Sequence, residues 1–236
     1  MRSEIAFEFL EYPTIEALAE AAARDVAAII EDRVATSGTA LIALPGGSTP
    51  RPVFKRLATA DLQWTKVTII PGDDRLVSAD SALSNVAELG RAFSSTGARI
   101  VPLFDYTDDY RAAGNQADNR LHEFSWPPDL VWLGMGTDGH TASIFPGPDL
   151  NRALNGPADQ RAIGVMPDPL PAEAPVPRVS LTRSAILSAR FLMVTLRGQD
   201  KRNLIKDAIA RGADSELPIG RVLAGAGQKV QIYCCP

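Results

Sequence analysis

Several features that mark particular protein classes are missing from this sequence. Cysteine occurs only twice in 236 residues, as the adjacent pair Cys234 and Cys235. Adjacent cysteines suit neither a loop-closing disulfide nor the C-x-x-C redox motif, so we expect both thiols to be reduced and structural. Histidine also occurs twice, at His122 and His140, and no Cys/His cluster has metal-ligand spacing. The sequence therefore predicts no zinc site, and we expect no metal and no cofactor.

Long apolar runs and concentrations of positive charge are missing as well. The longest helix-like apolar region, residues 17–30, is interrupted by three charged side chains and is too short to cross a bilayer. No apolar run near the N-terminus is long enough for a signal peptide, so a cytoplasmic location is the expectation. Twenty-four Lys and Arg face 28 Asp and Glu, for a formal net charge of −4. We therefore expect no membrane and no nucleic-acid partner.

The remaining composition is that of an ordinary globular protein. Hydrophobic residues make up 45% of the chain and charged residues 22%, and the length suffices for a core without disulfide or metal staples. Short apolar runs alternate with segments of helical periodicity. The predicted strands are 5–10, 40–44, 67–70, 100–104, 130–133, 162–166, 179–181, 191–196 and 230–233. The predicted helices are 14–35, 50–58, 110–124 and 199–210.

This alternation indicates the fold class. Strands that alternate with helices pair in parallel, and continuous apolar strands are typical of sheets covered on both faces. We therefore predict an α/β layered fold with a mostly parallel sheet flanked by helices on both faces. Residues 145–177 carry eight prolines and are expected to form a loop-rich excursion with little regular helix. Because the alternation resumes afterwards, we expect residues 1–236 to form a single domain.

A glycine-rich loop follows the predicted strand at 40–44. It carries Gly46, Gly47, Ser48 and Thr49 and leads into a helix with a proline at its start. Glycines let the backbone approach an anion closely, and hydroxyls add hydrogen-bond donors. These four residues therefore predict a phosphate cradle, although a turn in which Ser48 or Thr49 caps the helix is the alternative. A nucleoside triphosphate is disfavoured because no Gly-Lys-Ser/Thr follows.

Three charged residues, Asp73, Asp74 and Arg75, follow the predicted strand at 67–70. A solvated surface turn is one interpretation, because three charges are costly to bury. In open α/β sheets, however, ligands bind beyond the carboxyl ends of the strands, where both this cluster and the glycine loop fall. An arginine beside two carboxylates is also suited to receive an anionic oxygen. The cluster is therefore a candidate part of a binding or catalytic site.

A third strand end presents a histidine. Gly134, Gly136 and Gly139 match the G-x-G-x-x-G dinucleotide pattern, but prolines at 146 and 148 leave no room for the crossover helix that this fingerprint requires. What remains is a glycine-rich loop that carries Asp138 and His140. Imidazole is the side chain best suited to accept a proton near neutral pH, so His140 is the candidate general base.

Two cationic residues lie near the ends of other strands. Arg178 opens the strand at 179–181, and Lys201 begins the helix after the strand at 191–196. Either could be ordinary surface charge. Residues from different strand ends can nevertheless converge over one pocket, and a phosphate needs more than one positive group to offset its charge. Both are therefore candidates for phosphate binding.

Four sequence blocks occur here in the order seen in 6-phosphogluconolactonases, which the chain resembles over most of its length. The blocks are residues 44–50 (Leu-Pro-Gly-Gly-Ser-Thr-Pro), 72–75 (Gly-Asp-Asp-Arg) with Ser84-Asn85 downstream, 134–146, and 177–182 (Pro-Arg-Val-Ser-Leu-Thr). The most specific is Gly-x-Asp-Gly-His-Thr-Ala-Ser-x-Phe-Pro at 136–146. Because this family belongs to a larger group that includes glucosamine-6-phosphate deaminases, the resemblance implies a sugar-phosphate isomerase/deaminase-like fold.

The resemblance also implies an activity: hydrolysis of 6-phospho-D-glucono-1,5-lactone to 6-phosphogluconate in the oxidative pentose phosphate pathway. Under this hypothesis His140 deprotonates a water without a metal, Asp73 or Asp138 orients the imidazole, and Arg75 contacts sugar oxygens or developing charge. The residues expected to hold the phosphate are Gly46, Gly47, Ser48, Thr49, Arg178 and Lys201. We expect a monomer whose partner is the small-molecule sugar-phosphate lactone.

Two other functions compete with the lactonase. A deaminase or isomerase on the same scaffold would, by resemblance, carry a glutamate shortly after the histidine and a tyrosine where this chain has Arg75. Here Phe145 and Pro146 occupy the region after the histidine, which favours the lactonase. A non-catalytic sugar-phosphate sensor would retain the phosphate cradle, but it would not need His140 as a base.

Overall fold

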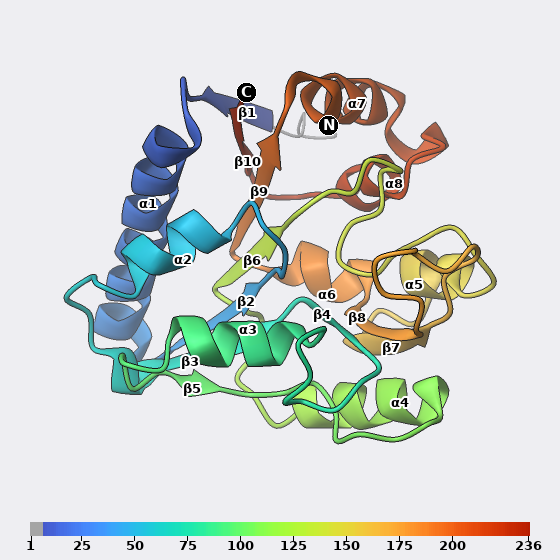
Figure 1. Cartoon of the computed structure of the whole chain (residues 1–236), viewed down its shortest axis with the longest axis horizontal. Helices are drawn as coiled ribbons and strands as arrows, with labels where there is room; N and C mark the ends of the chain where they lie inside the picture. Colours follow the sequence, from blue (N-terminus) through green and yellow to red (C-terminus); the bar gives the residue numbers. More distant parts are fainter. Residues whose placement is uncertain (1–6) are drawn as a thin grey trace.

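The fold is organised around a seven-stranded parallel sheet (Figure 1). The protein is described by a computed structural model over residues 7–236. In spatial order the strands are β1 (Phe7–Glu11), β10 (Val230–Cys235), β9 (Phe191–Arg197), β6 (Leu130–Leu133), β2 (Ala40–Leu44), β3 (Val67–Pro71) and β5 (Arg99–Ile100). Each neighbouring pair is parallel. The predicted α/β fold with a mostly parallel sheet is confirmed.

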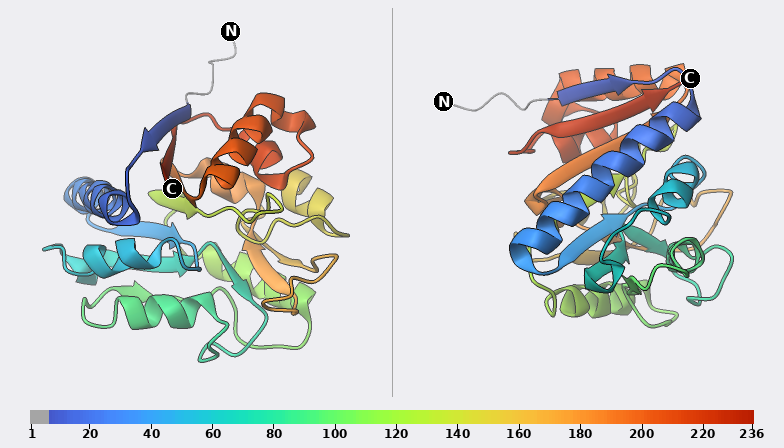
Figure 2. Two further views of the ribbon diagram at one scale, coloured as in Figure 1. Left: turned by 45° about the horizontal axis from the view of Figure 1, so that its top comes forward. Right: turned by 90° about the vertical axis from the view of Figure 1, so that its left-hand side faces the viewer.

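Helices cover both faces of this sheet (Figures 1 and 2). One face packs against α1 (Ile15–Ser37), α2 (Arg51–Leu57) and α3 (Asn85–Ala92), and the other against α4 (Tyr110–Leu121), α6 (Arg183–Ser188), α7 (Gln199–Arg211) and α8 (Pro218–Leu223). Side chains alternate along β2. Ile42 and Leu44 therefore pack in the core on the α1 side of the sheet, whereas Leu41 and Ala43 pack in the core on the α4 side. Continuous apolar strands therefore bury both of their faces, as predicted.

The longest helix, α1, has a clear start and stop in the sequence. The Thr14 side chain accepts a hydrogen bond from the Ala17 N–H, which caps the first turn. Gly38 ends the helix with a φ of 81°, in the left-handed region that favours glycine. Within residues 7–236, neither α1 nor any other helix combines the length and apolarity needed to span a membrane.

A second sheet is antiparallel and has three short strands. Its order is β4 (Asp73–Arg75), β8 (Arg178–Leu181) and β7 (Ala162–Val165). The sequence correctly predicts strands near 162–166 and 179–181, but the inference that alternation pairs them in parallel is wrong for these two. β4 was not predicted, because three consecutive charged residues have no apolar pattern and suggest a turn. This small sheet contributes directly to the site described below.

Other differences lie in the short elements. The predicted strand 100–104 ends early, since Pro102 has no N–H for the ladder. Three further helices, α5 (Leu150–Asn155), α6 and α8, each have six residues, and α3 has eight, too few for a clear helical period. Two 3-10 helices, η1 (Trp64–Lys66) and η2 (Gly212–Asp214), complete the set. α5 interrupts the proline-rich excursion, and residues 5–6 of the first predicted strand lie outside the described residues.

Cys234 and Cys235 end β10 as free, buried thiols. Cys234 packs in the core cluster on the α4 side, and Cys235 packs on the α1 side. Burial raises the pKa of both thiols, so both stay protonated at neutral pH. The expectation that they are reduced and structural is confirmed.

Candidate active site

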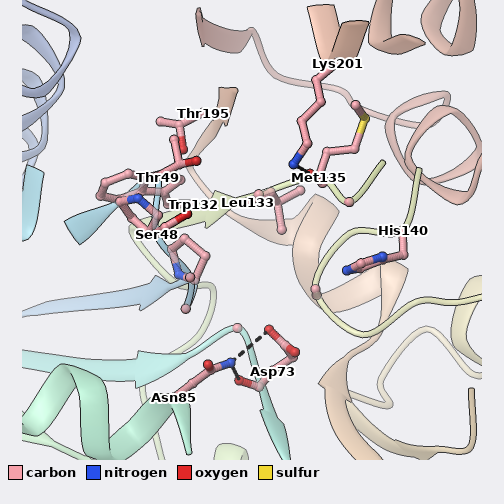
Figure 3. Close-up of a pocket in the computed structure, with 18 of the residues that line it drawn as sticks. Ser48, Thr49, Asp73, Asn85, Trp132, Leu133, Met135, His140, Thr195 and Lys201 are labelled. Atoms are coloured by element: carbon pink, nitrogen blue, oxygen red, sulfur yellow. Dashed lines mark hydrogen bonds between the residues drawn. The ribbon is translucent and has the colours of Figure 1, made fainter. Parts of the chain in front are cut away.

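A cavity of about 250 Å³ opens at the carboxyl end of the large sheet (Figure 3). It brings together eight of the ten predicted site residues: Gly46, Gly47, Ser48, Thr49, Asp73, Arg75, His140 and Lys201. Asp138 and Arg178 do not line it. The other lining residues are Pro45, Pro50, Gly72, Asn85, Trp132, Leu133, Gly134, Met135, Gly136, Ala142 and Thr195. The position fits the rule that open α/β sheets bind ligands beyond their carboxyl ends.

The strand order explains why distant segments meet here. β6 lies between β9 and β2 in the sheet. The loop after β2 carries Ser48 and Thr49, and the helix after β9 carries Lys201, so they lie on either side of the end of β6. Figure 3 shows His140 and Asp73 away from Ser48 and Thr49. The cavity therefore has an end made by hydroxyls and backbone and an end made by titratable side chains.

The glycine loop approaches its neighbours closely. A Cβ at Gly46 would lie 1.9 Å from the Asn85 Oδ1, so only glycine fits there. Helix α2 begins at Arg51 after Pro50, and no side chain caps it. The alternative in which Ser48 or Thr49 caps this helix is therefore wrong. The hydroxyl groups of Ser48 and Thr49 do not cap α2, and both residues line the cavity.

The three charged residues of β4 divide between two roles. Asp74 is only 3% exposed, and its carboxylate accepts hydrogen bonds from the N–H groups of Arg75, Asn85 and Val86 at 2.6–3.0 Å and from the Ser84 hydroxyl at 3.0 Å. Burial raises its pKa, and these hydrogen bonds oppose that rise. The surface-turn interpretation is wrong for Asp74, which instead anchors the start of α3. Because side chains alternate along a strand, Asp73 and Arg75 point the other way and line the cavity.

Asn85 links these two residues, and sequence reasoning gave it no role. Its Nδ2 donates to the Asp73 carbonyl oxygen at 2.8 Å, while its Oδ1 accepts from the Arg75 Nη1 at 3.1 Å. Arg75 Nη1 also donates to the Leu83 carbonyl at 2.6 Å. Asn85 is buried and sits at the first position of α3, so its side chain is fixed by the helix start. The only sign in the sequence that Asn85 belongs to the site is its place in the Ser84-Asn85 block.

His140 is held by a carboxylate on one edge and an aromatic ring on one face. Its Nδ1 lies 2.5 Å from the Asp138 Oδ1, and its ring stacks on Phe145 with centroids 4.0 Å apart. An ionised carboxylate can accept hydrogen bonds but cannot donate them. Asp138 therefore places the imidazole proton on Nδ1, which leaves Nε2 free to accept a proton. Although burial raises the pKa of Asp138, the hydrogen bond and charge of His140 lower it overall. Asp138, rather than Asp73, contacts the imidazole.

The loop that carries His140 has little freedom. A Cβ at Gly136 would lie 2.2 Å from the His140 Nδ1, so glycine is required beneath the imidazole. Ala142 adopts a φ of 46°, which costs energy for a residue with a Cβ. Ser143 then anchors the loop twice, since its N–H donates to the Ser180 Oγ at 3.1 Å and its hydroxyl donates to the Asp73 Oδ2 at 2.6 Å. The loop is thereby fixed to the small sheet.

The two predicted phosphate cations differ in their positions. Lys201 lines the cavity and donates from Nζ to the Met135 carbonyl oxygen at 2.6 Å; burial lowers its pKa, and Asp138 opposes this. Arg178 is 2% exposed and lies opposite Arg75 in the β4–β8 ladder. Its Nη1 has no hydrogen-bond partner within the described part of the chain. Burial and then Arg75 lower its pKa. Arg178 thus lies beside Arg75, but it is not among the residues that line the cavity with Lys201.

A second cavity of about 560 Å³ adjoins the first on the far side of His140. Both cavities share Gly136, His140 and Lys201, and Asp138 lines the second one. Residues 168–173 of the proline-rich excursion form its outer wall. The edge of the histidine that faces Asp138 is therefore accessible from the second cavity. Within residues 7–236 no three Cys, His, Asp or Glu side chains gather in a way that could hold a metal ion.

Comparisons with known proteins agree with this geometry. Residues 13–231 match the family described as glucosamine-6-phosphate isomerases/6-phosphogluconolactonase. The 6-phosphogluconolactonase of Rhizobium meliloti is 38% identical over 93% of this chain and 95% of its own, and that of Pseudomonas putida is 34% identical over 96% and 92%. A crystal structure of a 6-phosphogluconolactonase from Shewanella baltica superposes with a TM-score of 0.89 over all of both chains, at 29% identity.

A more distant neighbour shares the fold alone. A monomeric glucosamine-6-phosphate deaminase superposes with a TM-score of 0.79 at 18% identity, over 97% of both chains. The family resemblance and the fold that it implied are confirmed. This chain belongs to the glucosamine-6-phosphate isomerase/6-phosphogluconolactonase family.

Proposed function

We propose that this chain hydrolyses 6-phospho-D-glucono-1,5-lactone to 6-phospho-D-gluconate. The relatives that match it over nearly their whole length carry the name 6-phosphogluconolactonase. The observation that carries the proposal is one cavity that holds an Asp138-oriented His140 together with the Gly46–Thr49 loop and Lys201. Two positions favour the lactonase over the deaminase. The deaminase branch, by resemblance, carries a tyrosine where this chain has Arg75 and a glutamate in the region that Phe145 occupies here.

The reaction needs a base and stabilisation of a tetrahedral intermediate. In the first step His140 Nε2 accepts a proton from water while the water oxygen bonds to the lactone carbonyl carbon, and the carbonyl electron pair moves onto its oxygen. In the second step that pair re-forms the carbonyl as the bond to the ring oxygen breaks. The imidazolium returns its proton to the departing ring oxygen. The acid product then ionises, so one proton is released per turnover and no metal is required.

Asp138 and Arg75 support this chemistry in different ways. Asp138 keeps the proton on Nδ1 before the reaction and stabilises the imidazolium that forms. Arg75, held by Asn85 and the Leu83 carbonyl, has further N–H donors for sugar oxygens or for the negative charge that develops on the carbonyl oxygen. Asp73 positions the histidine loop through Ser143. Arg178, the partner of Arg75 in the β4–β8 ladder, adds positive charge beside the cavity.

The phosphate binds at the opposite end of the cavity. Backbone N–H groups of Gly46 and Gly47, the hydroxyls of Ser48 and Thr49, and the Lys201 ammonium surround it in this proposal. Anchoring the phosphate holds the lactone carbon near the activated water, which converts binding energy into orientation. In this proposal residues 1–236 act as one domain and as a monomer. The free, buried thiols suit a reducing compartment such as the cytoplasm.

Proton release from freshly made lactone tests the activity. Wild type, His140→Ala and a reaction without enzyme are compared near pH 7, because the lactone also hydrolyses spontaneously. We expect wild type to accelerate release, and His140→Ala to lose that acceleration while still binding 6-phosphogluconate. His122→Ala is the matched control, since His122 lies at the exposed end of α4. A wild-type rate equal to the background would refute the lactonase, and ammonia release from glucosamine 6-phosphate would then be measured.

A further inference from the structure

A buried hydroxyl at the end of β9 has no part in the interactions described so far. Thr195 is 2% exposed, yet it lines the cavity. Its Oγ1 accepts a hydrogen bond from the Trp132 Nε1 at 3.0 Å. A threonine hydroxyl is both acceptor and donor, whereas an indole N–H can only donate. Since Trp132 takes up an acceptor site of Thr195, the hydroxyl proton remains to be donated, and no acceptor for it lies among residues 7–236.

The surroundings of Thr195 indicate what it can donate to. Trp132 and Thr195 both face the α1 side of the sheet, on which α2 and the loop before it also lie. Figure 3 shows Thr195 close to Thr49 in this view and on the side of the cavity away from His140. Lys201 lies six positions further along the chain, in the first turn of α7. The free proton therefore lies at the end of the cavity made by hydroxyls and loop backbone.

We propose that Thr195 donates a hydrogen bond to a phosphate oxygen of the substrate and that Trp132 holds the hydroxyl in the orientation to do so. This rests on the proposed function and adds a residue to its phosphate end. A phosphate monoester offers several charged acceptor oxygens, and hydrogen bonds to charged groups are stronger than neutral ones. The Trp132 N–H occupies a lone pair of the Thr195 hydroxyl. The hydroxyl is therefore held in an orientation in which its proton, rather than that lone pair, faces the anion. Thr195 thereby selects for phosphorylated lactones.

A different expectation follows if the Trp132–Thr195 hydrogen bond serves packing alone. Loss of the hydroxyl would then change the free energy of unfolding, and it would affect phosphorylated and unphosphorylated lactones equally. A phosphate contact instead affects only ligands that carry the phosphate. The comparison between 6-phosphogluconolactone and glucono-1,5-lactone separates the two roles.

The variants Thr195→Val and Thr195→Ser test the proposal, with Thr68→Val as the matched control on β3, outside the cavity lining. Thr195→Val keeps the shape and removes the hydroxyl. We expect its KM for 6-phosphogluconolactone and its Kd for 6-phosphogluconate to rise about tenfold or more, with kcat within about twofold. Its kcat/KM for glucono-1,5-lactone stays at the wild-type value. Thr195→Ser restores the donor and most of the affinity, and Trp132→Phe gives a smaller rise in KM.

Two results would overturn the assignment. One is a Thr195→Val protein that binds 6-phosphogluconate as tightly as wild type in calorimetry. The other is an equal loss of activity toward both lactones, which would indicate a packing role. Calorimetry also keeps this test separate from the test of the activity. If wild type binds 6-phosphogluconate but hydrolyses no lactone, the proposed function fails while the binding comparison still decides the role of Thr195. If wild type binds no 6-phosphogluconate, both proposals fail.

Discussion

The seven-stranded sheet and the three-stranded sheet equip the cavity by different means. The large sheet supplies loop backbone, hydroxyls and Lys201, which follow directly from where its strands end. The small sheet supplies Asp73 and Arg75 and, through Ser180, fixes the loop of His140. In the proposed site the ends of the parallel sheet carry the anion-binding groups, whereas the charged side chains are held in place by cross-links between strands and loops. Substitutions on the two sides should consequently differ in kind.

The largest effect is expected at the carboxylate that fixes the histidine. In Asp138→Asn the amide no longer enforces a proton on Nδ1, so Nε2 is not held as the acceptor. We expect kcat to fall about 100-fold or more, with little change in the affinity for 6-phosphogluconate. The lowered pKa of Asp138 keeps it ionised down to a pH below the usual range of an aspartate, so the wild-type rate should not lose this carboxylate near neutrality. Steady-state kinetics from pH 5 to 9 measures both points, and an unchanged kcat would contradict them.

The cross-link at the small sheet comes next. Asn85→Ala removes the hydrogen bonds to the Asp73 carbonyl and from Arg75, and it leaves a space beside Gly46. We expect kcat/KM to fall about 10- to 100-fold, since a misplaced catalytic group lowers the rate steeply. Asn203→Ala in α7 serves as a control, because its side chain bonds only to exposed Gln199. Equal kinetics for Asn85→Ala and wild type would show that Arg75 needs no such support.

On the large-sheet side, Lys201→Met should raise KM about tenfold while kcat changes less, because it removes an anchor rather than a reacting group. The pKa of Lys201 is lowered by burial, so the protonated amine is lost as the pH rises through a value below the usual lysine range. The Kd of 6-phosphogluconate should therefore begin to increase at a pH below the usual range of a lysine pKa for wild type. Calorimetry from pH 7 to 10 measures this, and a parallel pH dependence in Lys201→Met would argue against Lys201 as its source.

The smallest effect is expected at Ala142, on the loop between the two sheets. Its positive φ costs an alanine about 1 kcal/mol, which glycine would relieve, but glycine loses about 0.4–1 kcal/mol through its freer unfolded chain. The two contributions nearly cancel, so Ala142→Gly should change the free energy of unfolding by no more than about 0.5 kcal/mol. Ala27→Gly in α1 has no strain to relieve and should lose about 1 kcal/mol. Urea unfolding of both variants makes the comparison, and similar losses would show that the loop stores no strain.

The two regions also differ in how far they can be predicted. Apolar runs reveal the strands of the large sheet, and polar residues after those runs reveal Ser48, Thr49 and Lys201. The strand β4 cannot be recognised in the sequence because it has no apolar pattern. It forms by pairing with β8, which lies more than one hundred positions later in the chain. Asn85 was missed because an asparagine at a helix start is ordinary in sequence.

Three further assignments depended on the path of a loop. Phe145 suggests core from sequence alone, although it also stacks on His140. The choice between Asp73 and Asp138 required the turn at Gly139, with its φ of 77°, which brings Asp138 back to the imidazole. Arg178 is a candidate for phosphate binding because it opens a strand, and the sequence does not show that this strand belongs to the second sheet, where Arg178 is the direct partner of Arg75 and is not among the residues that line the cavity.

The first described strand pairs with the last one, from Phe7 opposite Val230 to Glu11 opposite Cys234. During synthesis on the ribosome, β1 therefore emerges early and stays without its partner until residues 230–235 have been made. The strands whose ends form the cavity, β2, β3, β6 and β9, all precede β10 and can pair with one another first. Nascent chains stalled before β10 should thus already contain the central part of the sheet, while β1 stays unpaired until β10 emerges.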